Sequence, residues 1–201
     1  MAFLSLVVLS PLLFLTIIAV VLESPGTPFY RAWRAGKDGI PFRMWKFRSM
    51  VPDADRLGGC ITAPRDSRIT RVGRFIRATK IDELPQFVNL LVGDLTLVGP
   101  RPEDPKIVKR YSDEQRQTLK VKPGITGPGT LYYTTDQFEA IPLGVETDEF
   151  YVEHLLEKKL RIDLDYLKKR TLVSDFSLVL QTIAVMAKTL TNATRQSRVE
   201  S

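Results

Sequence analysis

The N-terminal segment constrains this chain more than any other feature. Residues 2–22, AFLSLVVLSPLLFLTIIAVVL, carry no charged side chain and match the roughly 20 residues that a helix needs to cross a bilayer. A cleaved secretory signal would have basic residues before this run and a small-residue cleavage site after it. Here the run follows Met1 directly and leads into ESPGTPFYR. We therefore expect residues 1–23 to form a membrane segment.

Pro11, preceded by Ser10, lies in the middle of this run and predicts a kink, because proline removes a helical hydrogen bond and clashes with the preceding turn. In hydrocarbon the freed carbonyl groups need new partners, and the Ser10 hydroxyl can be one of them. Two interpretations remain open from these residues. The length of the run favours a bent transmembrane anchor, and the alternative is a re-entrant helix-break-helix that returns to the same side.

Basic residues gather directly after the apolar run: Arg31, Arg34, Lys37, Arg43, Lys46 and Arg48. The positive-inside rule places such a cluster, and with it the rest of the chain, on the cytoplasmic side. Aromatic residues are interleaved with these bases: Phe29, Tyr30, Trp33, Phe42 and Trp45. This pattern is typical of a surface at the lipid headgroups, and an ordinary amphipathic core edge explains it equally well.

Composition narrows the class of partner. Lys and Arg outnumber Asp and Glu by 29 to 23, which favours nucleic acid, anionic lipid or a phosphorylated substrate. Nucleic acid is disfavoured, because the chain has no recognised nucleic-acid motif and its bases crowd toward the apolar run. With one cysteine, Cys60, and one histidine, His154, the chain has no zinc-ligand set, so a metal would be held by carboxylates, which favours Mg²⁺.

The remaining pattern predicts an α/β fold that is mainly helical with a small β-hairpin. We expect the hairpin within residues 24–50, a surface loop over 51–66, helices from 67 to 76 and from 82 to 93, and a loop over 121–130. A charged amphipathic helix is expected over 146–169 and a more apolar one over 172–190. We expect a compact core over 24–190, with amphipathic helices at the membrane interface, and a frayed polar tail over 191–201.

Asp82 and Glu83 are adjacent carboxylates at the start of a predicted helix. Such a pair is commonly an N-cap with an acidic first turn. Three nearby bases, Arg77, Lys80 and the proline-flanked Arg101, indicate a further function. Guanidinium groups around two carboxylates form a site for phosphate plus a divalent cation, with one carboxylate free to act as a nucleophile.

Five segments in order resemble the bacterial sugar transferase family, the monotopic phosphoglycosyl transferases, in their small, catalytic-core-only form. They are LSPLLFL (9–15), MWKFRSM (44–50), KIDELPQFVNLLVGDLTLVGPRP (80–102), VKPGITG (121–127) and IDLDYLKKRTLVSDF (162–176). These enzymes transfer a sugar 1-phosphate from a nucleoside-diphosphate sugar to polyprenyl phosphate. The resemblance implies a transferase that uses a UDP-sugar and initiates lipid-linked glycan synthesis for polysaccharide or other glycoconjugates.

The resemblance also implies roles for individual residues. Asp82 would be the nucleophile, Glu83 the catalytic ligand of Mg²⁺, and Arg77 and Arg101 would hold phosphate oxygens. Lys46 and Arg48 would add positive charge near the polyprenyl phosphate or the membrane surface. Pro102 and Thr126 lie in the matched phosphate-binding segments. Asp163, Tyr166 and Asp175 also match, and we interpret them as structural, because an Asp at a helix turn is usually a cap or a salt-bridge partner.

For the membrane segment, the resemblance implies the re-entrant form, with Ser10 and Pro11 at the break. The protein would then be monotopic in the bacterial inner membrane, with its catalytic domain on the cytoplasmic face, in contact with membrane lipids and with no nucleic acid. The resemblance also allows a homodimer and implies downstream glycosyltransferases as partners. The alternative is a catalytically silent scaffold of the same fold that binds lipid or a partner enzyme.

The sequence departs from the family pattern in two places. Members carry a basic and aromatic stretch before the apolar run, whereas this chain begins almost inside it, from which we expect a late start codon or a branch without that anchor. After VKPGITG the chain continues with its own segment over residues 128–155, which we expect to contribute to sugar or nucleotide recognition.

Overall fold

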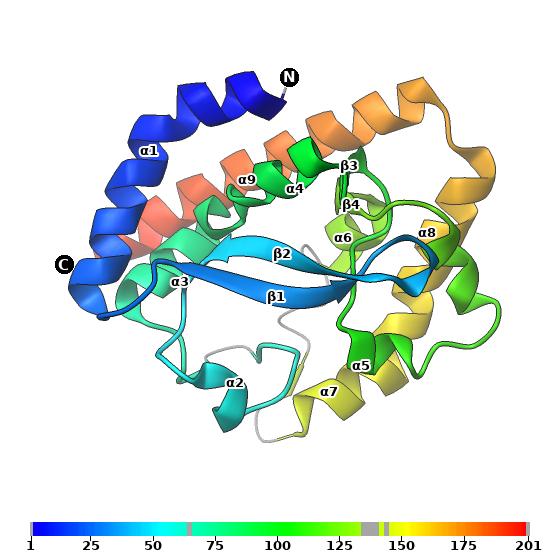
Figure 1. Ribbon diagram of the computed structural model, residues 1–201, viewed down its shortest axis with the longest axis horizontal. Coiled ribbons are helices and arrows are strands. Elements are labelled where there is room, and N and C mark those ends of the chain that lie inside the picture. Colours follow the sequence, from blue (N-terminus) through cyan, green and yellow to red (C-terminus); the bar gives the residue numbers. More distant parts are fainter. Residues whose placement is uncertain (1, 64–65, 134–140, 143–144, 200–201) are drawn as a thin grey trace.

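The fold is described from a computed structural model, which covers residues 2–63, 66–133, 141–142 and 145–199. Its helices and strands, in chain order, are α1 (Ala2–Glu23), β1 (Phe29–Ala35), β2 (Pro41–Phe47), α2 (Ala54–Leu57), α3 (Arg71–Ala78), α4 (Gln86–Val92), β3 (Thr96–Val98), α5 (Pro105–Val108), β4 (Gly124–Thr126), α6 (Pro128–Tyr132), α7 (Thr147–Phe150), α8 (Glu157–Lys169) and α9 (Leu172–Val199). The hairpin of β1 and β2 crosses the middle of the molecule, with α1 and α3 at one end and α5 near the other (Figure 1). The expected helical protein with a small hairpin is confirmed.

Helix α1 is continuous and bent, with Pro11 inside it (Figure 1). The Ser10 hydroxyl donates a 2.8 Å hydrogen bond to the carbonyl of Val7, which lies four residues before Pro11 and is the group that proline leaves without its helical partner. The expected break is therefore a bend within one helix. Residues Leu6–Glu23 have a mean hydropathy of 2.6 and are 11% buried, so the helix is long and apolar enough to cross a membrane.

The C-terminal end of α1 is attached firmly to the rest of the protein. Val20 packs in a buried cluster with Phe47 of β2 and Ile76 of α3. The Glu23 carboxylate accepts hydrogen bonds from the backbone N–H groups of Arg71 and Val72, at 2.8 and 2.9 Å, and so caps the first turn of α3. The position of α1 in a membrane would therefore also fix the position of α3, the helix that precedes the Asp82-Glu83 pair.

The hairpin pairs β1 with β2 in antiparallel register from Phe29 opposite Phe47 to Ala35 opposite Pro41. Two cation–π contacts cross it: the guanidinium of Arg31 lies 5.0 Å from the centre of the Trp45 ring, and that of Arg43 lies 4.1 Å from Trp33. The interleaved aromatic and basic residues thus pair across the strands.

The prediction of a loop over residues 121–130 is wrong. Strand β4 pairs in parallel with β3, and α6 follows it. A Cβ on Gly124 would overlap the backbone nitrogen of Gly99, so the glycine allows the two segments to approach closely enough to pair. The same glycines and prolines that suggested a loop in the sequence are the residues that make this pairing fit.

Three helix boundaries also differ from expectation. The helix expected from residue 67 starts at Arg71, after the N-cap Thr70, whose side chain accepts a hydrogen bond from the N–H of Gly73. The helix expected over 82–93 divides into a 3₁₀ turn, Ile81–Glu83, and α4, which begins after Pro85. Helix α9 continues to Val199, through the region expected to be a frayed tail.

Candidate active site

Asp82 and Glu83 lie on the 3₁₀ turn between α3 and α4. Lys80, directly before this turn, has a left-handed backbone with φ of 59°, which separates the turn from the helical conformation of α3. Asp82 is buried, at 4% exposure. The turn therefore places two carboxylates at the junction of α3, α4 and the hairpin, instead of on a solvated first helical turn.

The Glu83 carboxylate binds two cationic side chains from distant segments. Lys46 of β2 donates to Glu83 Oε1 at 2.9 Å, and Arg101 donates from Nη1 to Oε2 at 3.2 Å and from Nη2 to Oε1. Burial opposes ionisation of Glu83, but the charges of Arg101 and Lys46 outweigh it and hold the pKa of Glu83 well below its usual range. Glu83 is therefore a fixed negative charge at neutral pH.

The Asp82 carboxylate has a different environment. Its Oδ1 is buried and has no hydrogen-bond partner among the described residues. Burial raises the pKa of Asp82, and the nearby charge of Lys46 opposes that rise. A poorly solvated carboxylate oxygen with a free lone pair is suited to attack an electrophile, so the two neighbours differ in what they can do chemically.

The structure brings together five of the residues singled out in the sequence: Lys46, Arg77, Asp82, Glu83 and Arg101. Arg77, in the last turn of α3, reaches the Ser49 hydroxyl at 3.4 Å, and its charge acts on Asp82. The bases come from β2, from α3 and from the segment after β3. Together they form a positively charged surrounding for two carboxylates, which suits a phosphate group.

The other predicted site residues lie elsewhere. Arg48 donates to the backbone carbonyls of Ser24 and Pro25, and so holds the end of α1. The hydroxyl of Thr126 lies 2.6 Å from that of Thr182 in α9 and joins β4 to that helix. Ser10 and Pro11 lie in α1. Pro102 is buried directly after Arg101. Of the segment 128–155, residues 134–140 and 143–144 lie outside the described residues.

A magnesium ion fits this site only as a partner of a phosphorylated substrate. Among the described residues there is no group of three His, Cys, Asp or Glu side chains that could hold a metal alone. Glu83 and Asp82 are consecutive residues of the 3₁₀ turn, and the Oδ1 of Asp82 has no hydrogen-bond partner among the described residues. Mg²⁺ typically takes one or two carboxylates and completes its shell with water and substrate phosphates, so this donor set is compatible with it.

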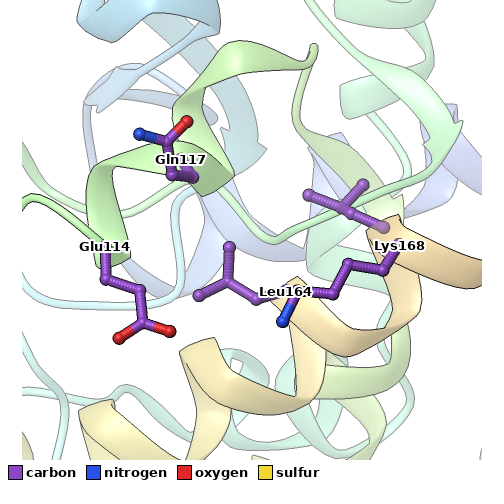
Figure 2. A pocket seen from close by; sticks show the side chains of 5 residues that line it. Glu114, Gln117, Leu164 and Lys168 are labelled. Carbon is purple, nitrogen blue, oxygen red and sulfur yellow. The ribbon is translucent and has the colours of Figure 1, made fainter.

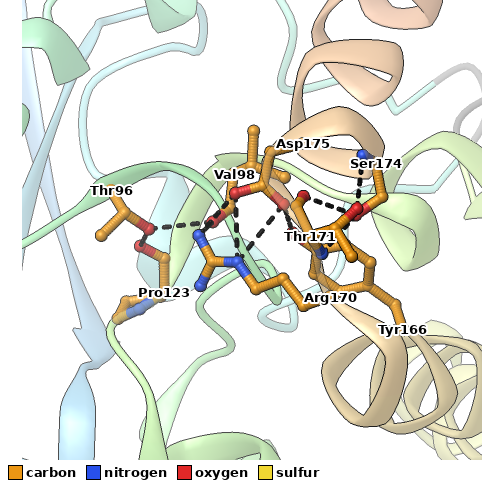
Figure 3. A network of polar contacts seen from close by, with 8 residues as sticks. All are labelled: Thr96, Val98, Pro123, Tyr166, Arg170, Thr171, Ser174 and Asp175. Atoms are coloured by element: carbon orange, nitrogen blue, oxygen red, sulfur yellow. Dashed lines mark hydrogen bonds and ion pairs between the residues drawn. The ribbon is translucent and has the colours of Figure 1, made fainter.

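Three matched residues of the C-terminal segment have structural contacts. Asp163 is fully buried and accepts a 2.9 Å hydrogen bond from the N–H of Gly129, which ties α8 to α6. Asp175 of α9 binds Tyr166 and Arg170, and Arg170 also reaches the carbonyl of Val98 in β3 (Figure 3). These bonds fix the corner between α8 and α9 against the parallel strand pair, in line with the structural interpretation.

A shallow hollow of about 280 Å³ lies between α8 and the turn over residues 115–120, lined by Glu114, Gln117, Leu164, Leu167 and Lys168 (Figure 2). No residue of the Asp82-Glu83 cluster lines it. It is therefore a separate surface feature.

Two groups of residues escaped the sequence analysis. Asn89 of α4, at 1% exposure, accepts from the N–H of Trp45 and donates to the carbonyl of Arg43, which joins β2 to α4. Glu103 and Lys159 form a buried ion pair beside Arg101. Lys159 stands among charged residues in the run EKKLRIDLDYLKK, so the sequence predicts an exposed side chain there, whereas the structure leaves it only 1% exposed.

The fold joins an apolar helix that is long enough to cross a membrane to a compact part of the chain in which two carboxylates are surrounded by basic side chains. The family model described as bacterial sugar transferase matches residues 1–189. The chain belongs to the bacterial sugar transferase family.

Curated relatives carry related names. The chain is 37% identical to a UDP-glucose:undecaprenyl-phosphate glucose-1-phosphate transferase of Escherichia coli, over 91% of this chain and 38% of the relative. It is 37% identical to a protein of the same name from Caulobacter vibrioides, over 90% of this chain and 64% of the relative. A UDP-N-acetylgalactosamine-undecaprenyl-phosphate N-acetylgalactosaminephosphotransferase of Aeromonas hydrophila is 38% identical, over 72% of this chain and 35% of the relative. The chain thus spans between about a third and two thirds of these relatives.

Proposed function

We propose that this protein transfers a sugar 1-phosphate from a UDP-sugar to a membrane polyprenyl phosphate. One observation carries the proposal: in a chain of this family, Asp82 is a buried carboxylate whose Oδ1 has no hydrogen-bond partner among the described residues, and the next residue, Glu83, is a carboxylate held by two cationic side chains. The names of the relatives, which include glucose and N-acetylgalactosamine donors, support the general reaction and leave the sugar open.

The reaction would run in two steps. An Asp82 carboxylate oxygen attacks the sugar-linked phosphorus, the bond between that phosphorus and the bridging oxygen breaks, and UMP leaves with the electron pair. This gives an aspartyl phosphosugar. The phosphate oxygen of the polyprenyl phosphate then attacks the same phosphorus, which releases Asp82 and forms the polyprenyl diphosphosugar. A carboxylate nucleophile of this kind divides one difficult transfer into two easier ones.

The surrounding bases would bind and orient the donor. Arg101 and Arg77 offer planar guanidinium donors to the diphosphate, and Lys46 adds a point charge on the hairpin side. Magnesium, when bound through Glu83, would neutralise charge on the leaving UMP. As the diphosphate enters, Arg101 can exchange its bonds with Glu83 for bonds with phosphate oxygens, which frees Glu83 for the metal.

The membrane segment would bring this site to the lipid acceptor. The bend of α1, which has Pro11 inside it, and the attachment of its end to α3 through Glu23 support a re-entrant segment that holds the Asp82-Glu83 cluster at the cytoplasmic headgroup level. The product, a lipid-linked sugar, would be consumed by downstream glycosyltransferases. A homodimer is compatible with this arrangement.

The test is UMP release in detergent with undecaprenyl phosphate and Mg²⁺, using UDP-glucose, UDP-galactose, UDP-N-acetylglucosamine and UDP-N-acetylgalactosamine as donors. We expect wild type to release UMP with at least one donor and Asp82→Asn to release none. Binding of a donor without UMP release by folded wild type would instead support the silent scaffold.

A further inference from the structure

A second buried ion cluster lies directly behind Arg101, and the proposed reaction does not use it. Glu103 Oε1 accepts a 2.5 Å hydrogen bond from the Tyr151 hydroxyl and is also bound by the Lys159 ammonium group, which lies 3.2 Å from the same hydroxyl. Glu103 is 9% exposed, Tyr151 2% and Lys159 1%. Lysine is almost never this deeply buried without a specific partner, so the cluster needs an explanation.

A π-helical turn gives this cluster its geometry. Tyr151–Leu156 is π-helical, between α7 and α8. A regular α-helix, with about 3.6 residues per turn, returns to the same face after about seven residues. A π turn, with i→i+5 hydrogen bonds, accommodates an extra residue, so residues eight apart can share a face. Tyr151 and Lys159 are eight apart, and this turn allows both to reach one oxygen of Glu103.

The segment that carries Arg101 is held from both sides. Arg101 reaches Glu83 on one side, and Glu103, two residues later, reaches α8 on the other. Its backbone is stiff, because Pro100 and Pro102 flank Arg101. The carbonyl of Glu103 also accepts a 2.9 Å hydrogen bond from the N–H of Ala35 at the end of β1. The cavity behind this segment is about 10 Å³, at most the space of one water molecule.

We infer that Glu103, Lys159 and Tyr151 are positioning residues for Arg101, which hold its guanidinium at the place where the donor diphosphate must bind. The inference rests on the proposed function and extends it to residues that do not touch the substrate. When Arg101 exchanges Glu83 for a phosphate, the link to Glu83 is lost, and Glu103 keeps the segment in place. Burial opposes ionisation of Glu103, but the charge of Lys159 holds its pKa low, so the anchor persists at neutral pH.

A double-mutant cycle on kcat/KM for the UDP-sugar tests this. We expect Glu103→Gln to lower kcat/KM by about 10- to 100-fold, the typical cost of losing a supporting contact. In an Arg101→Lys background, where the guanidinium is already absent, the same change should lower it less than about threefold, since coupled residues are not additive. Equal factors in both backgrounds would overturn the inference, because Glu103 would then act independently of Arg101.

Two further variants separate positioning from folding. Glu103→Gln/Lys159→Met removes both charges and should fold, because it leaves no buried charge unpaired; it should still lose about 10-fold in kcat/KM. Tyr151→Phe should lower kcat/KM, whereas Tyr111→Phe, a buried tyrosine of the same hydrophobic cluster that is not bonded to Glu103, should not. Wild-type kcat/KM in the folded double variant would contradict the inference. Wild type without UMP release on any donor would overturn the proposed function itself, and this inference with it.

Discussion

Arg101 donates to both oxygens of Glu83, across 18 residues of sequence and from a segment that two prolines hold extended. This two-point contact requires a planar guanidinium, which a lysine lacks. The pair connects the turn that carries Asp82 to the segment after β3. It also defines a geometry that can be tested by single substitutions.

Arg101→Lys keeps the positive charge and removes the two-point geometry. We expect kcat/KM for the UDP-sugar to fall by about 10- to 100-fold, while the thermal unfolding temperature changes little, because Glu83 keeps a cationic partner in Lys46. Lys46→Arg is the matched control, since it exchanges the same two residue types on the other side of Glu83. Unchanged kcat/KM in Arg101→Lys would show that the guanidinium fork is not needed.

Glu83→Gln removes the charge that Lys46 and Arg101 share. Both activity and the dependence of UMP release on Mg²⁺ concentration should weaken, because a neutral amide is a poorer ligand for a hard cation. Stability should fall by about 1–3 kcal/mol, since two partly buried cations lose their common partner. A titration of UMP release against Mg²⁺ measures the first effect and chemical denaturation the second. An unaltered Mg²⁺ requirement would exclude Glu83 as the metal ligand.

The raised pKa of Asp163 predicts that its contribution to the stability of the protein falls as the pH rises, the opposite of the usual effect of an aspartate. Burial raises its pKa from 3.8 to about 6, so the folded protein keeps a proton that the unfolded chain has already lost. Its contribution therefore makes the protein less stable as the pH rises from 3.8 to about 6, by about 3 kcal/mol in total, and is constant above that window. Asp163→Asn should abolish this slope in denaturation curves taken across that range.

Asp175→Asn is the matched control for that slope. Burial opposes ionisation of Asp175, but hydrogen bonds from Arg170 and Tyr166 hold its pKa below the ordinary 3.8. Its stabilising contribution is therefore present above pH 3.8 and lost as the pH falls below that value. The slope between 3.8 and about 6 should survive in Asp175→Asn, and its loss there would contradict the assignment to Asp163.

The re-entrant form of α1 predicts that both of its ends face the same side of the membrane. In a Cys60→Ser background, we expect Ala2→Cys and Glu157→Cys to react with a membrane-impermeant maleimide from the same side of inverted vesicles. Glu157 serves as the reference because its side chain is 70% exposed on α8. Pro11→Ala should move position 2 to the opposite side, since it removes the cause of the bend. Labelling of the two positions from opposite sides in the Pro11 protein would establish a spanning helix.

Sequence patterns of short range predicted much of this structure. The Gly and Pro residues around short extended pieces in 24–50 predicted the hairpin, and Pro11 with Ser10 predicted a bend in α1 and a hydrogen-bond partner for the freed carbonyl group. The grouping of Arg77, Asp82, Glu83 and Arg101 followed from their proximity in sequence and from the resemblance to the family. The hairpin and the bend follow from the backbone preferences of proline and glycine, which can be recognised in the sequence without knowledge of distant contacts.

What the sequence did not reveal depends on contacts between distant segments. The pairing of β3 with β4 involves strands of only three residues, which are too short to carry a periodic signal. The π turn, and the meeting of Tyr151 and Lys159 at Glu103, require knowing how α8 packs on the segment after β3. Such contacts determine how a helix is placed against its neighbours, and the hydrophobic pattern of the helix does not reveal them.

The most direct test of the central claim is a single-turnover reaction without the lipid acceptor. The donor that supports UMP release is incubated with stoichiometric protein and Mg²⁺, and the intact protein is then examined by mass spectrometry and peptide mapping. We predict about one UMP per protein and a sugar phosphate bound to Asp82, absent in Asp82→Asn and removed when undecaprenyl phosphate is added. UMP release that requires the acceptor in every turnover, with no adduct on Asp82, would contradict the covalent mechanism and indicate direct transfer between the two substrates.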